Sequence, residues 1–124
     1  MRRQIEKRRI EFRGTPGGAP ERQVTLADGR RYTHRCSPQT FEKVAAYLDE
    51  HSAQNLKMQS LADAIEAPMT QVNVALQLLG ERGLIVTDGR VVSIREGYRT
   101  AFHEHAMTEF YALIEGCPPE YGEA

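Results

Sequence analysis

The sequence predicts a mainly α fold with a small amount of β structure. Three helices and a short hairpin are expected in its centre, with another hairpin before them and an amphipathic helix after them. Apolar residues recur at helical spacing in four segments. An Asp-Gly pair separates two alternating segments at two places, and Pro68 interrupts the middle of the chain.

The first part of the chain, residues 1–36, is predicted to form a basic arm and a β-hairpin. It holds ten Lys and Arg against four Asp and Glu. Residues 10–12 alternate and allow a short strand, and residues 14–20 contain three Gly and two Pro, which favours a hinge. Asp28-Gly29 lies between two alternating segments and predicts a two-residue turn, since both residues tolerate a positive φ.

The central part, residues 37–95, is predicted to form one domain that begins with a helix. Ser37 is a good N-cap, and Pro38 fits the first helical position because its missing N–H is not needed there. The apolar face that follows has helical spacing. It consists of Phe41, Val44, Ala45 and Leu48.

Two shorter helices are expected within residues 56–79. Only Glu66, Ala67 and Pro68 separate their apolar faces, and Pro68 forbids one continuous helix. Two helices joined by such a turn form a helix-turn-helix. Gly83 suits the end of the second helix, and Asp88-Gly89 then predicts a two-stranded hairpin. The sequence therefore predicts a winged helix-turn-helix.

The segment LADAIEAPMTQVNVALQLLGERGLI also resembles the helix-turn-helix and wing entry of winged-helix transcription regulators of the GntR, MarR and PadR kind. Two positions depart from that pattern. Glu66 stands where these regulators usually have Gly, so a left-handed backbone there would cost on the order of 1–2 kcal/mol. Lys57 stands where they usually have a Ser or Thr cap.

The resemblance implies that the second helix of the pair reads DNA bases in the major groove. The matching side chains that can contact base edges are Thr70, Asn73 and Gln77. No Lys or Arg lies between Met58 and Glu81, so this face alone offers no phosphate contact. Backbone contacts are instead expected from basic residues elsewhere. These are Arg2, Arg3, Lys7, Arg8, Arg9, Arg13, Arg90 and Arg95. A second cluster on the first hairpin, Arg30, Arg31 and Arg35, extends this footprint or faces water as protection of a strand edge.

A last helix is predicted within residues 96–116, followed by an acidic tail, residues 117–124. Its apolar stripe must pack on the chain itself or on a partner. The resemblance implies dimerisation, so we expect a homodimer whose interface uses this stripe. The stripe consists of Tyr98, Phe102, Ala106, Phe110 and Leu113.

The leading functional hypothesis is a homodimeric DNA-binding transcriptional regulator. The alternative is a protein-interaction module within a larger assembly, with little or no DNA binding. It depends on the acidic tail and on Met69 and Val74, two apolar residues expected on the exposed face of the second helix of the pair.

Other classes of function find no support in the residues. There is no catalytic motif, so an enzyme is not expected, and no cofactor is implied. His103 and His105 point to different sides of a helix, and the two cysteines, Cys36 and Cys117, are far apart, so no metal site or disulfide is expected. No apolar run is long enough to span a membrane and no secretory leader is present, so we expect a cytoplasmic protein.

Overall fold

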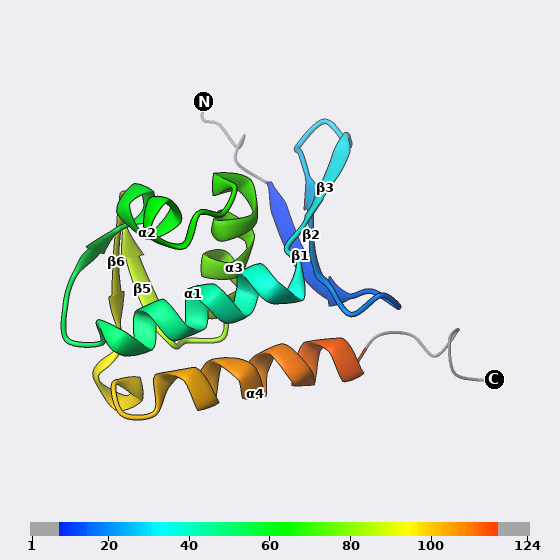
Figure 1. Cartoon of the computed structure of the whole chain (residues 1–124). Helices are drawn as coiled ribbons and strands as arrows, with labels where there is room; N and C mark the ends of the chain where they lie inside the picture. Colours follow the sequence, from blue (N-terminus) through cyan, green and yellow to red (C-terminus); the bar gives the residue numbers. More distant parts are fainter. Residues whose placement is uncertain (1–7, 117–124) are drawn as a thin grey trace.

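The computed structural model of the protein describes residues 8–116. Four α-helices and six strands follow one another in the order β1, β2, β3, α1, β4, α2, α3, β5, β6 and α4 (Figure 1). The strands are β1 (Arg9–Gly14), β2 (Pro20–Thr25), β3 (Arg31–Arg35), β4 (Leu56–Lys57), β5 (Ile85–Asp88) and β6 (Val91–Ile94). The helices are α1 (Pro38–Glu50), α2 (Met58–Ile65), α3 (Met69–Glu81) and α4 (Phe102–Glu115).

Strands β1, β2 and β3 form an antiparallel sheet in sequential order, which we call the N-terminal sheet. The Gly-rich segment between β1 and β2 is a tight turn, closed by a hydrogen bond from the Gly18 N–H to the Thr15 carbonyl. The β2–β3 connection spans residues 26–30, so the predicted turn at Gly29 exists but is longer than two residues. Gly29 takes a φ of +92°, which glycine adopts without strain.

The three helices after this sheet begin and end close to where their local signals lie. The Ser37 hydroxyl accepts a hydrogen bond from the Thr40 N–H at 3.0 Å, which confirms the predicted cap of α1. Glu66, between α2 and α3, has φ 56° and ψ 50°, the left-handed conformation expected to carry strain. Lys57 precedes α2 without a capping side-chain hydrogen bond.

The second sheet has the order β4-β6-β5, so its members are not sequential. Strands β5 and β6 form the predicted hairpin. Strand β4 has only two residues, and it joins the sheet because Leu56 pairs with Val92. No alternation or turn in the sequence marks this strand.

Helix α4 packs beside α1 and against β1 (Figure 1). It begins at Phe102, later than predicted, because Glu96–Tyr98 is a 3₁₀ turn and Ala101 is left-handed. The Asp49 carboxylate of α1 accepts a hydrogen bond from the His103 N–H and so caps α4. At the other end, a Cβ on Gly14 would lie 2.8 Å from the Ile114 Cα, so only glycine lets β1 approach α4 this closely.

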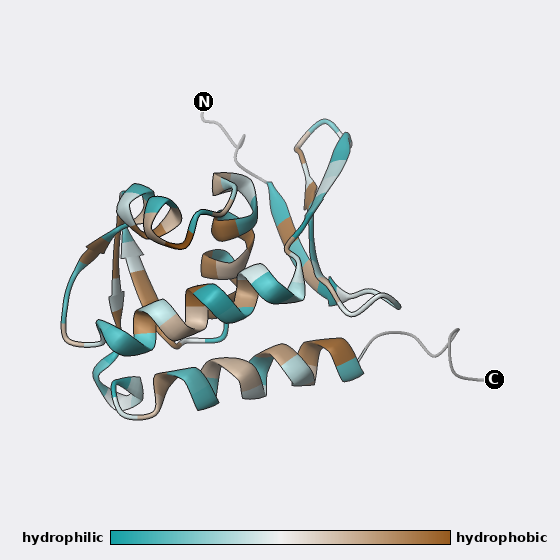
Figure 2. Cartoon of the chain, viewed as in Figure 1, coloured by the Kyte–Doolittle hydropathy of each residue, from teal (hydrophilic) through white to brown (hydrophobic). Residues whose placement is uncertain are grey.

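One apolar core joins these elements. Phe41 of α1 packs on Phe110 of α4 with ring centroids 5.0 Å apart, and both belong to the same buried cluster as Leu61, Leu76 and Val92. Figure 2 shows hydrophobic residues along the faces that these helices turn toward one another.

The predicted fold class is therefore wrong. The prediction was mainly α, with three helices, a two-stranded wing, an N-terminal hairpin and a C-terminal helix. Within residues 8–116 the structure instead has four helices and two three-stranded antiparallel sheets, with 47% of these residues in helices and 25% in strands, which is an α+β composition. Two strands cause the difference. The first, β1, pairs with β2 along its whole length, and the second, β4, is recruited from a segment with no strand signal.

Candidate nucleic-acid interface

The base-facing residues predicted on α3 are not equally accessible. Thr70 is exposed, but Asn73 and Gln77 are half-buried. The Gln77 Oε1 atom accepts a hydrogen bond from Arg22 Nη1 at 2.7 Å, because β2 packs against this side of α3. Gln77 is therefore occupied within the chain and is not free to pair with a base.

Arg22 is buried, and its guanidinium contacts Gln77 and His34 rather than a carboxylate. It is 7% exposed, and its Nη2 atom lies 2.9 Å from His34 Nδ1. Its Nε atom is buried and has no hydrogen-bond partner among the described residues. Burial is the largest cause that lowers the pKa of Arg22, and the nearby charge of Arg8 lowers it further. Arg22 thus fixes the sheet to α3 and is not a surface contact.

The alternative protein-binding surface on α3 is not present. Val74 is fully buried, and Met69 is half-buried and packs against the core. The prediction that these two side chains are exposed is wrong, because β2 and β3 cover the side of α3 that the isolated helical pattern leaves open.

The basic residues fall into groups that the sequence does not separate. Arg2, Arg3 and Lys7 lie outside the described residues. Arg90, in the β5–β6 turn, and Arg95, directly after β6, are exposed. The remaining predicted backbone contacts, Arg8, Arg9 and Arg13, lie on or next to β1.

Side chains alternate between the two faces of the N-terminal sheet, and the strand register shows which of them lie side by side. The inner face carries apolar residues of β1 and packs against α3. The outer face carries three rows, each with one residue from each strand. Arginines stand only in the two end rows, which are separated by a middle row of Glu11, Gln23 and Thr33. The first row is Arg13, Glu21 and Arg35, and the second row is Arg9, Thr25 and Arg31.

The first row is an internal ion-pair cluster. Glu21 Oε1 lies 2.7 Å from Arg13 Nε, and Glu21 Oε2 lies 3.0 Å from Arg35 Nε. Burial, the largest single cause, raises the pKa of Glu21, but the hydrogen bonds from the two guanidinium groups outweigh it and lower the pKa overall. Arg13 is therefore paired inside the protein, contrary to its predicted role as a phosphate contact.

The second row has no carboxylate. Arg9 and Arg31 flank Thr25, and Arg8 and Arg30 adjoin them in sequence. All four arginines are exposed, and only Arg30 makes an ion pair within the described residues, with Asp28. We call these four residues the arginine end of the sheet. Figure 2 shows hydrophilic residues at the start of β1 and around the β2–β3 turn, where this end lies.

The sequence shows the four arginines of the arginine end, but it does not show that they lie close together in the folded sheet. Arg9 was assigned to a terminal arm and Arg31 to a separate hairpin. The alternation in residues 9–13 was the available signal, since it places Arg9 and Arg13 on one face of a strand. Which strand pairs with which, and in which register, is decided only by the folded sheet.

The apolar stripe of α4 is used within the chain. Phe102, Ala106, Phe110 and Leu113 are buried in the common core, and Tyr98 packs against it from the 3₁₀ turn. These buried side chains are therefore not available for the predicted dimer interface, and the homodimer itself stays a prediction. Intramolecular packing, the other possibility, accounts for these residues, because α1 and β1 cover them.

Two further findings limit the chemistry of residues 8–116. Burial raises the pKa of Cys36 to about 12, so its thiol stays protonated and is not a nucleophile at neutral pH. Within the same range, no cluster of three or more His, Cys, Asp and Glu side chains could hold a metal ion.

None of the helices described is long and apolar enough to cross a membrane.

Comparison of the chain with protein-family models, with curated protein sequences and with solved structures finds no match.

Proposed function

We propose that the chain is a DNA-binding regulator that contacts the phosphate backbone of double-stranded DNA through the arginine end of the N-terminal sheet. The observation that supports it most is the grouping of four exposed arginines at one end of the sheet, where neither Arg9 nor Arg31 makes an ion pair within the described residues. Neutralising phosphates with Arg and releasing their counterions supplies most of the affinity in sequence-independent DNA binding.

The distribution of charge favours this end of the molecule. Residues 8–36 hold seven Arg against three Asp and Glu, whereas residues 37–116 hold six Lys and Arg against eleven Asp and Glu. A polyanion is attracted to the first part and repelled by the second, so it approaches the N-terminal sheet.

The shape of the sheet suits the same ligand. The β2–β3 turn projects away from the helices (Figure 1), and Arg30 and Arg31 stand at its end. A two-stranded ribbon of this kind fits the major groove of B-DNA. Thr70 on α3 does not share this surface, because α3 packs against the inner face of the sheet and the arginine rows lie on the outer face.

A gel-shift titration with random duplex DNA at low salt tests the proposal. The double variant Arg9→Glu/Arg31→Glu should weaken binding by about tenfold for each lost phosphate contact at about 0.1 M salt. The slope of log K against log salt should become shallower by about one for each contact.

The matched control is Lys43→Glu/Arg99→Glu, which makes the same charge change at exposed positions of α1 and the segment before α4. It should leave binding close to that of the original chain. Absence of binding by the original chain at micromolar concentration, or equal loss in the two double variants, would refute the proposal.

A further inference from the structure

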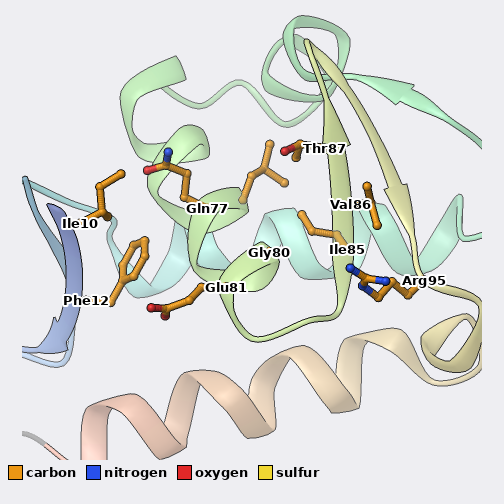
Figure 3. A pocket seen from close by; sticks show the side chains of 10 residues that line it. Ile10, Phe12, Gln77, Gly80, Glu81, Ile85, Val86, Thr87 and Arg95 are labelled. Carbon is orange, nitrogen blue, oxygen red and sulfur yellow. The ribbon is translucent and has the colours of Figure 1, made fainter. Parts of the chain in front are cut away.

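A groove of about 450 Å³ lies across α3, between the N-terminal sheet and the second sheet (Figure 3). Its walls are the edge strands β1 and β5, and α3 forms the floor. The volume is in the range of small-molecule sites in proteins. The apolar part of its lining consists of Ile10, Phe12, Leu76, Ile85 and Val86.

Gly80 lines the floor of this groove and has no side chain to fill it. It lies in the last turns of α3, where glycine costs about 1 kcal/mol relative to alanine. Packing does not require glycine here, because an added Cβ would meet no atom closer than the Ile85 side chain, at 4.0 Å. The missing side chain leaves space that is open to the groove.

The charges in the groove are separated. Arg95 reaches in beside β5, and Figure 3 shows its guanidinium on the side opposite Glu81. Neither side chain makes an ion pair within residues 8–116. Gln77 also lines the groove, and the buried Arg22 lies directly behind its amide. Arg95 is therefore the exposed cation of the groove that an anion can reach on the side away from Glu81.

We propose that this groove binds a small organic anion with an apolar body. Its carboxylate or sulfonate pairs with Arg95, and its apolar part lies over Gly80 against Phe12 and Val86. The proposal is independent of the DNA surface, because Arg95 and Gly80 are not part of the arginine end.

Two related dyes test it with the full-length protein. Anilinonaphthalene sulfonate is apolar and anionic, and phenylnaphthylamine has nearly the same body without charge. Both should bind with saturable fluorescence enhancement. Arg95→Gln should weaken the anionic dye about tenfold, as expected for loss of a charge-assisted hydrogen bond. It should change binding of the neutral dye less than twofold, whereas Arg99→Gln, the control, should affect neither dye.

A second variant tests the location. Gly80→Leu fills the floor and replaces a helical glycine by a better helix former, so the variant should fold. It should abolish binding of both dyes, and amide resonances of Gly80 and Thr87 should shift when the original protein binds the anionic dye. Equal effects of Arg95→Gln on the two dyes, or unchanged binding in Gly80→Leu, would overturn the proposal. No saturable binding of either dye would also overturn it and would leave the groove to a larger occupant such as an extended peptide.

Discussion

The two ends of the N-terminal sheet are built alike and differ at one position. Each end places an arginine of β1 and an arginine of β3 on either side of a β2 residue. At one end that residue is Glu21, and at the other it is Thr25. Neighbouring strands lie about 4.8 Å apart, so a carboxylate at the central position reaches both arginines, while a threonine leaves both uncompensated. One end is therefore cross-linked by ion pairs, whereas at the other end neither Arg9 nor Arg31 makes an ion pair within the described residues.

Arginines at equivalent positions of the two ends differ in whether they are paired within the sheet. A tally of basic residues treats Arg13 and Arg9 as equal, yet Arg13 is paired at 2.7 Å and Arg9 makes no ion pair within the described chain. Stability is expected to depend on the first row and DNA binding on the second.

The largest effect is expected from making the two ends identical. Thr25→Glu places a carboxylate between Arg9 and Arg31, as Glu21 lies between Arg13 and Arg35. DNA affinity should fall by about tenfold for each arginine withdrawn from phosphate contact, so on the order of a hundredfold at about 0.1 M salt. Thr25→Gln, of the same shape without charge, should stay within a few-fold of the original protein in the same gel-shift titration. Equal losses in the two variants would contradict the comparison.

The converse change removes the carboxylate that is present. Glu21→Gln leaves Arg13 and Arg35 without their shared partner, and the free energy of unfolding should fall by about 1–2 kcal/mol. The value is modest because both arginine side chains are more than half exposed to solvent. Urea denaturation measures it. DNA binding should not weaken, since the arginine end is untouched, and weaker binding would show that the two ends are not separate.

Acidification should lower the free energy of unfolding, as Glu21→Gln does, because it protonates the carboxylate of the first row. The pKa of Glu21 in the folded protein lies below the value of 4.5 of a free Glu, so its contribution to stability is complete above about pH 4.5. The contribution is lost as the pH falls through the folded-state pKa. The difference in unfolding free energy between the original protein and Glu21→Gln should therefore shrink at acid pH. A difference that stays constant down to about pH 3 would contradict the assigned role of the carboxylate.

The smallest effect is expected in the free energy of unfolding when single arginines on β1 are replaced. Arg13→Gln should lower the free energy of unfolding by about 0.5–1 kcal/mol, the range of a partly exposed ion pair. Arg9→Gln should change it by less than about 0.5 kcal/mol, as expected for an exposed residue outside such a cluster. Thermal unfolding of both variants measures the difference, and equal destabilisation would remove the distinction between the rows.

Local signals in the sequence predicted most of the elements. Ser37 with Pro38 marked the start of α1, Pro68 separated α2 from α3, and the alternation after Gly83 gave β5 and β6. These signals work because capping, proline geometry and periodicity depend only on neighbouring residues. Of the two possibilities at Glu66, a left-handed backbone or a different turn geometry, the structure has the left-handed backbone, with a φ of 56°.

Long-range pairing could not be predicted in this way. Leu56 and Lys57 form a strand only because Val92 and Val91 lie beside them, more than thirty positions further along the chain. Val74 was expected to be exposed because its burial depends on the N-terminal sheet, and the periodicity of α3 alone carries no information about that cover. The same holds for the α4 stripe, whose apolar spacing predicts burial but not the surface that buries it.

The sequence by itself determined where most helices and turns lie, and that the first part of the chain is basic and the rest acidic. Only the tertiary structure decided that β1 joins β2 and β3, and that Glu21 therefore pairs with Arg13 and Arg35. It also decided that Arg9 and Arg31 make no ion pair within residues 8–116. The physical reason is that strand register brings together side chains that are far apart along the chain. The composition of the chain gives its total charge, whereas the register decides which charges are neutralised within the sheet.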